Sequence, residues 1–137
     1  MFGISAKLPI QRDPVDGFTL TKTYKENIAQ NMKHLLLTVP GERMMDPNFG
    51  VGLKEYLFEP NVSIVHSQIR QNIKEQVNIY LPFVEVRSVN FLTGTEINLR
   101  DALALAEEDE HRLSIEVVYK ILPLDIIDAL VVRVDLV

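Results

Sequence analysis

The stretch Thr38–Pro60, TVPGERMMDPNFGVGLKEYLFEP, decides how this chain folds. It separates two segments of helical periodicity, and its proline and glycine pairs break any regular helix or strand within it. Large apolar residues lie between these breakers: Phe49, Leu53, Tyr56, Leu57 and Phe58. This combination is typical of an Ω-type loop held to the core by its own side chains. We therefore predict that Phe49, Leu57 and Phe58 are buried against the flanking helices, and that Leu53–Phe58 forms one or two helical turns.

The composition describes an ordinary water-soluble domain. The 137 residues, 47% of them hydrophobic, favour one domain over residues 1–137 with a single substantial core. There is no cysteine, which excludes disulfide frameworks, thiolate metal sites and cysteine nucleophiles. The net charge of −5 opposes sequence-independent binding of nucleic acid. Neither a membrane-spanning run nor a signal-peptide core is visible, so we expect no membrane contact and folding in a reducing cytoplasm.

Two helices flank the loop. Thr23–Val39 begins with the capping-box spacing of Thr23 and Glu26. Its apolar stripe is Tyr24, Ile28, Met32, Leu35, Leu36 and Val39. The second helix is expected to run from an N-cap at Asn61 to about Leu81, where Pro82 stops it. Its apolar stripe is Val62, Val65, Ile69, Ile73, Val77 and Tyr80.

Alternating apolar residues predict the strands. Residues 1–22 form an N-terminal strand or hairpin arm, with a strand over Ile4–Ile10, a turn at 13–17 and a short return over Phe18–Leu20. Three further strands are expected near Val84–Phe91, with a bulge at Arg87-Ser88, and over Leu113–Ile121 and Leu130–Val137. The segment 93–111 between the first two of these three is predicted to be a protruding acidic excursion.

These elements predict an α+β fold in which two amphipathic helices are packed on a three-stranded antiparallel sheet, with the N-terminal strand or hairpin nearby. The last strand is a candidate open edge because no later segment follows it. Its even-numbered residues would be buried, and its odd face would carry Arg133 and Asp135. A central position for this strand, between the other two, remains an alternative.

No catalytic, cofactor or metal site emerges from the sequence. The three histidines, His34, His66 and His111, lack metal-ligand spacing, and Gly50-Val51-Gly52 lacks the third glycine of a dinucleotide loop. A glycosidase needs two carboxyl groups a few ångströms apart, and four acidic residues of the loop could converge in this way: Glu42, Asp46, Glu55 and Glu59. With 19 acidic residues in the chain, four in this window is near chance. We therefore predict that the protein is not an enzyme.

The loop motif resembles a known family. A helix ending in LLLTVPGER, followed by DPNFGVGL, LFEP and a second amphipathic helix, is similar to the baseplate wedge proteins of contractile phage tails. The family includes sheath initiators once described as tail lysozymes, and a related baseplate subunit of type VI secretion systems. The resemblance covers nearly the whole chain, from about Ile4 to Val137. Its specific structural loop residues are Gly41, Arg43, Pro47, Phe49, Gly50, Leu57 and Phe58.

The resemblance implies a structural protein of the virion baseplate, assembled in the host bacterial cytoplasm. Its expected partners are the tail sheath protein, the wedge proteins and tail tube or hub proteins, and it would nucleate the sheath by strand addition. The alternatives are a peptidoglycan-cleaving tail lysozyme, a type VI baseplate subunit and a regulator of similar fold that binds a partner without any tail. The candidate docking strip is Leu130, Val131, Val132, Arg133, Val134, Asp135, Leu136 and Val137.

One position departs from the family. Where relatives often carry Glu-Pro-Arg after the second helix, this chain has Leu81-Pro82-Phe83. The proline that stops the helix remains, and both charges are lost. We therefore expect Leu81, Pro82 and Phe83 to lie on the surface as an apolar contact with the wedge. The alternative is that Phe83 closes the core under the sheet.

Overall fold

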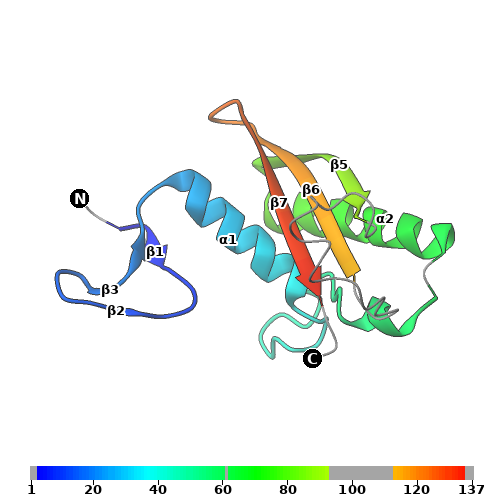
Figure 1. The fold of residues 1–137 in the computed structure, drawn as a ribbon, viewed down its shortest axis with the longest axis horizontal. Coiled ribbons are helices and arrows are strands. Elements are labelled where there is room, and N and C mark those ends of the chain that lie inside the picture. Colours follow the sequence, from blue (N-terminus) through cyan, green and yellow to red (C-terminus); the bar gives the residue numbers. More distant parts are fainter. Residues whose placement is uncertain (1–2, 61, 93–112, 135–137) are drawn as a thin grey trace, which may run out of the picture. The chain divides into compact units, whose positions relative to one another are not determined.

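The fold was analysed in a computed structural model, which describes residues 3–60, 62–92 and 113–134. It divides into two compact units, Met1–His34 and Leu35–Val137, which are described separately (Figure 1). The first holds four short strands and most of the first helix, and the second holds the loop, the second helix and the sheet. The predicted acidic excursion over 93–111 lies outside the described residues.

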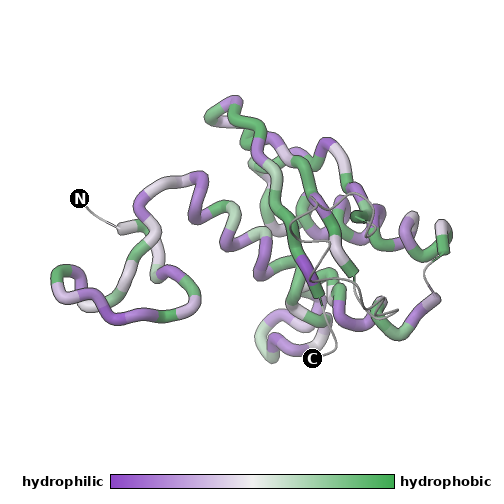
Figure 2. Tube along the Cα trace, viewed as in Figure 1, coloured by the Kyte–Doolittle hydropathy of each residue, from purple (hydrophilic) through white to green (hydrophobic). Residues whose placement is uncertain are grey.

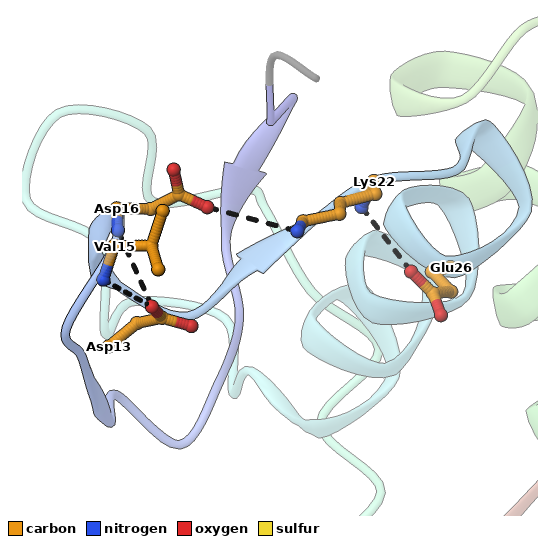
Figure 3. Close-up of polar contacts among 5 residues, drawn as sticks. All are labelled: Asp13, Val15, Asp16, Lys22 and Glu26. Atoms are coloured by element: carbon orange, nitrogen blue, oxygen red, sulfur yellow. Dashed lines mark hydrogen bonds and ion pairs between the residues drawn. The ribbon is translucent and has the colours of Figure 1, made fainter.

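The N-terminal arm is a pair of short antiparallel ladders. Strand β1 (Ser5–Ala6) pairs with β4 (Leu20–Thr21), and β2 (Arg12–Asp13) pairs with β3 (Gly17–Phe18). The Asp13 carboxylate accepts the backbone N–H groups of Val15, at 2.8 Å, and Asp16, at 3.4 Å, which holds the turn (Figure 3). The predicted hairpin is confirmed, but the strand expected over Ile4–Ile10 is reduced to two residues because Pro9 cannot donate to a ladder.

Polar side chains fix this arm inside its own unit. Gln30 accepts the Leu8 N–H through Oε1 at 3.0 Å and donates through Nε2 to the Ala6 carbonyl at 2.9 Å. Its side-chain amide thus bonds to the backbone at the end of β1 as a neighbouring strand would. Lys22 forms an ion pair with Asp16 at 3.8 Å, and its N–H donates to Glu26 Oε2 at 3.4 Å (Figure 3). The arm is therefore ordered by local hydrogen bonds.

Helix α1 (Tyr24–Leu37) begins where the capping residue predicts. The Thr23 hydroxyl accepts the Glu26 N–H at 3.2 Å. The stripe residues Ile28, Met32, Leu35 and Leu36 are buried. Tyr24 is 66% exposed, so its assignment to the stripe is wrong; it lies in the first turn, ahead of the buried positions.

The loop is ordered and attached at several points, as predicted. The N–H groups of Val51, Gly52 and Leu53 donate to the carbonyls of Leu35, Thr38 and Leu36 at 2.9, 3.0 and 3.3 Å. From α2 (Ser63–Tyr80), Gln76 accepts the Gly50 N–H at 3.0 Å and donates to the Asn48 carbonyl at 3.1 Å. Gly50 has φ +114° and lies so close to the Thr38 carbonyl that no side chain fits there.

Two of the three aromatic and leucine anchors predicted for the loop are correct. Phe49 and Leu57 are buried, whereas Phe58 is 77% exposed, so the prediction for Phe58 is wrong. Phe58 ends the 3₁₀ helix η1 (Glu55–Phe58) that was expected as a helical turn. In a single turn of this kind adjacent side chains point in different directions, so burying Leu57 turns Phe58 towards solvent.

Helix α2 carries its predicted stripe, with Val65, Ile69, Ile73 and Val77 buried. Val62, the N-cap residue, makes no side-chain capping bond and is 44% exposed, so its assignment to the stripe is wrong. Asn61, the predicted N-cap, lies outside the described residues. The helix ends at Tyr80, and the Leu81 N–H donates to the Val77 carbonyl at 2.8 Å before Pro82 turns the chain into the sheet.

The sheet has the order β5-β6-β7, with antiparallel pairing throughout (Figure 1). Its strands are β5 (Val84–Phe91), β6 (Leu113–Ile121) and β7 (Ile126–Val134). The predicted bulge is confirmed between Val86 and Ser88. The last strand begins at Ile126, four residues before its predicted start, and the alternative central position is wrong because β6 is central.

The sheet has one buried face, which α2 covers at β5. The inward residues of β6, Ile115, Val117, Tyr119 and Ile121, are fully buried and alternate with half-buried neighbours. Figure 2 shows hydrophobic and hydrophilic residues interspersed along the strands. The predicted α+β class, with two helices, a three-stranded antiparallel sheet and an N-terminal hairpin, is therefore confirmed.

Candidate assembly surface

The described residues contain no cluster typical of a metal site. Among residues 3–60, 62–92 and 113–134, no group of three or more histidines and carboxylates is placed to hold a metal ion. No helix in these ranges is long and apolar enough to span a bilayer.

The carboxylates considered for catalysis contribute instead to the loop or face solvent. Glu42 Oε2 accepts the Val39 N–H at 3.2 Å, which closes the first turn of the loop. The Asp46 carboxylate lies at the Tyr80 hydroxyl, and the pKa of Tyr80 is raised by burial first and by Asp46 second. Glu55 and Glu59 are exposed.

The outer edge of β7 carries unpaired backbone groups whose positions follow from the hydrogen bonds of β5. The Leu92 N–H donates to the Ser114 carbonyl at 2.9 Å, and the Leu122 N–H donates to the Phe83 carbonyl at 3.0 Å. Even-numbered residues of β6 therefore bond to β5, and its odd-numbered residues bond to β7.

The same alternation fixes which residues of β7 face outward. The odd residues of β6 are paired with even residues of β7, such as Ile115 with Val132 and Val117 with Leu130. The remaining residues of β7 direct their N–H and C=O groups away from the sheet: Ile127, Ala129, Val131 and Arg133. This row of donors and acceptors is what an added strand would pair with.

The two faces of β7 differ as predicted over the described part of the strip. Val132 and Val134 are buried and Leu130 is half-buried, whereas Val131 and Arg133 are exposed. Ile127, which the sequence prediction missed because it placed the start of the strand later, is 64% exposed and adds a second apolar side chain to the outer face. The predicted strip residues Asp135, Leu136 and Val137 lie outside the described residues.

A buried polar pair holds the first half of β7 in register. Tyr119 of β6 is fully buried and donates its hydroxyl to Asp128 Oδ2 of β7 at 3.2 Å, and the two residues are direct cross-strand partners. Burial first, and then the charge of Asp128, raise the pKa of Tyr119 well above its usual value. A slip of β7 by one residue would move Asp128 to the other face and leave the buried hydroxyl without this acceptor.

The segment after α2 is only partly on the surface. Leu81 is 7% exposed and belongs to the core, so its predicted surface position is wrong; it closes the helix end. Pro82 is exposed and Phe83 is 38% exposed. The turn between β6 and β7 lies next to them, and its Leu122 and Leu124 are 52% and 45% exposed. Sequence reasoning missed these leucines, although apolar residues on both sides of Pro123 were a visible signal.

An open hollow of about 270 Å³ adjoins this apolar group. It is lined by Lys74, Val77, Asn78, Pro82, Val84, Glu85, Val86 and Leu122. Its walls therefore come from α2, from β5 and from the β6–β7 turn, and they combine apolar side chains with one lysine and one glutamate. The exposed parts of Pro82, Phe83, Leu122 and Leu124 form a second candidate contact surface, at the end of the sheet where β5 begins and β6 turns into β7.

A comparison with protein families identifies the family of this chain, and two solved structures have a similar fold. The family model described as baseplate wedge protein gp25 matches residues 22–123. A solved structure of a candidate tail lysozyme from Geobacter sulfurreducens is similar, with TM-score 0.65 and 26% identity over 87% of this chain and 96% of that chain. A chain in the baseplate of the anti-feeding prophage has TM-score 0.67 and 22% identity, over 87% of this chain and 84% of that chain, and so shares the fold. No curated protein sequence matches.

Proposed function

Because the chain belongs to the baseplate wedge protein gp25 family, we propose that it joins the wedge of a contractile tail baseplate and nucleates the sheath by accepting strands at β7. The observation that carries this proposal is the row of outward backbone groups on Ile127, Ala129, Val131 and Arg133. Backbone groups give an added strand its affinity, and the outer side chains select which strand fits.

The chemistry of β7 supports a guest strand of defined character. Ile127 and Val131 offer apolar contacts on the outer face, and Arg133 offers a positive charge at the far end. We expect the arm of the sheath protein to place an apolar residue opposite Val131 and an acidic residue opposite Arg133. The arm of the sheath protein would pair with most of the described part of β7, from Ile127 to Arg133.

Attachment to the wedge is assigned to the second surface. Pro82 and Phe83, with Leu122 and Leu124, form an apolar contact at the end of the sheet, and tail tube or hub proteins would contact other surfaces. The proposed site of action is the baseplate of a phage tail or phage-like particle, a type VI baseplate subunit being the nearest alternative. The particle is assembled in the host bacterial cytoplasm.

The first test replaces Val131 with proline. Proline lacks the outward N–H, and its ring occupies space where the guest strand would lie, so sheath nucleation should be lost while the isolated protein stays folded. The measurement is the number of sheathed tails, counted by electron microscopy, when the variant replaces the wild type during particle assembly.

The control for this test is Val131→Thr, which keeps the N–H group and the β-branched shape and should leave sheath nucleation near the wild-type level. If folded Val131→Pro protein enters baseplates and they still acquire a sheath, strand addition at β7 is wrong.

The proposed role is structural and not enzymatic. The acidic residues of the loop are exposed or support the loop, so purified protein should release no soluble fragments from peptidoglycan. Lysozyme assayed in parallel provides the positive control. Cleavage by the wild type that disappears in Glu42→Gln, with the fold intact, would establish the lysozyme alternative instead.

A further inference from the structure

The sheet has a second edge, β5, whose outward groups are also defined by the hydrogen-bond alternation. Even-numbered residues of β6 bond to β5, so the β5 residues that direct their N–H and C=O groups away from the sheet are Val84, Val86, Val89 and Phe91. A sheet with two open edges could accept a strand on either side, and β7 alone would not define where a partner docks.

Helix α2 places a side chain on this edge. Arg70 donates through Nε to the outward carbonyl of Val89 at 3.2 Å, and its guanidinium carbon lies 5.1 Å from the centre of the Phe91 ring. One turn earlier, the His66 ring stacks on Phe91 with centres 3.9 Å apart and planes 7° from parallel. Arg70 therefore occupies the place of the donor that a guest strand would bring to Val89.

The bulge obstructs the same edge by a different route. It lies between Val86 and Ser88, so two residues and not one lie between Val86 and Val89, which are successive outward positions. A regular guest strand that pairs with one of these residues is out of register with the other. Arg87 is the extra residue of the bulge, and its side chain forms an ion pair with Glu85 at 3.2 Å. These charges at the edge further disfavour pairing with another strand.

The β7 edge lacks this cover. Within the described part of the chain, no side chain from another element bonds to the outward groups of Ile127, Ala129, Val131 or Arg133, and no register shift interrupts β7. The two edges of one small sheet are thus chemically different.

We infer that Arg70 closes the β5 edge and so makes the sheet accept a strand on one side only. Arg70 is a specificity-determining residue: it touches no partner, and it removes the wrong docking site. The inference rests on the proposed function in one respect, that the open β7 edge is the one that accepts a strand from a partner. The chemical difference between the edges does not depend on it.

A sheet with two open edges has a physical consequence that can be measured on the isolated protein. The β5 edge of one copy could pair with the β7 edge of the next, and such a head-to-tail contact does not close on itself. With Arg70 in place, association through edges stops at a β7–β7 dimer. Without it, the outward groups of Val89 and Phe91, which lie after the bulge and share one register, are open, and chains of copies can grow through this part of β5.

The experiment compares Arg70→Leu with the wild type by sedimentation velocity over a range of protein concentrations. Leucine keeps helix propensity and removes the guanidinium. The weight-average mass of Arg70→Leu should rise past the dimer mass as concentration increases, while the wild type stays at or below it. In the double variant with Val131→Pro, which blocks the β7 edge, the mass should stop at the dimer.

Two further variants keep the result interpretable. Lys33→Leu makes the same exchange of a basic residue for leucine at an exposed position of α1 and should behave as wild type. Arg70→Lys keeps the charge and lacks the planar guanidinium. Its weight-average mass should therefore also rise with concentration, which provides the test if Arg70→Leu proves too unstable to measure.

The inference is overturned if folded Arg70→Leu and Arg70→Lys keep the wild-type mass at every concentration. It is also overturned if association past the dimer persists unchanged with Val131→Pro. Neither readout involves a sheath, so failure of the proposed function in the assembly assay remains distinct from failure here.

Discussion

Replacing Phe49 with alanine is expected to lower the free energy of unfolding by about 3–5 kcal/mol, the range for a buried phenylalanine. Phe49 is 8% exposed and contacts two other side chains. The guanidinium carbon of Arg43 lies 3.7 Å above its ring centre, and the Tyr80 ring meets it edge-on at 4.8 Å. The substitution therefore removes buried apolar area, a cation–π contact and an aromatic pair together.

The measurement is urea denaturation followed by circular dichroism, and Phe58→Ala is the matched control. It deletes the same atoms from the same loop, but Phe58 is 77% exposed, so its effect should stay within about 0.5 kcal/mol. Equal midpoints for the two variants would show that Phe49 does not attach the loop to the core. The comparison needs no knowledge of the partner.

Replacing Val132 with proline should destabilise the isolated protein strongly, whereas the same change at Val131 should not. The Val132 N–H points towards β6, and its loss leaves the buried carbonyl of Ile115 without a donor. That unpaired carbonyl alone costs about 1–3 kcal/mol. The Val132 side chain is 2% exposed, so its packing is lost in addition. Val131 directs its N–H outward and its side chain to solvent, so proline there breaks no bond of the sheet.

Thermal unfolding of the two proline variants, measured side by side, tests the register directly. We expect a clear fall in melting temperature for Val132→Pro and a small change for Val131→Pro. A larger fall for Val131→Pro than for Val132→Pro would show that the outward N–H and C=O groups of β7 belong to its even-numbered residues. Equal and severe losses would mean that another strand covers the β7 edge in the isolated protein.

Periodic segments were predictable because burial imposes a repeat on the sequence. The α2 stripe from Val65 to Val77 and the β6 alternation from Leu113 to Ile121 follow the helical and strand periods closely. The bulge at Arg87 was visible as a change of parity between two apolar pairs. In each case burial of one face requires apolar residues at several regularly spaced positions, and this spacing is visible in the sequence.

Positions at the ends of elements were not predictable in the same way. Tyr24, Phe58 and Val62 are apolar or aromatic and yet exposed, while Leu81 is buried beyond the end of its helix. Where a repeat begins or stops, the direction of one side chain depends on a few backbone dihedral angles that no periodicity records. The contact of Arg70 with the β5 edge was also not visible, because it joins residues that only the folded chain brings together.

The division of β7 into two sets of residues has a consequence for evolution. The even-numbered residues from Ile126 to Val134 bond to β6 and include the buried side chains, so the stability of this domain selects them. The backbone groups of the odd-numbered residues bond to nothing in the described chain, and under the proposed function these residues are selected by the partner. Adjacent positions are therefore under different selective pressures. Under the proposed function, the odd-numbered positions can change together with the arm of a new sheath protein while the fold stays the same. Related baseplates would then keep one scaffold and diverge at every second residue of a single strand.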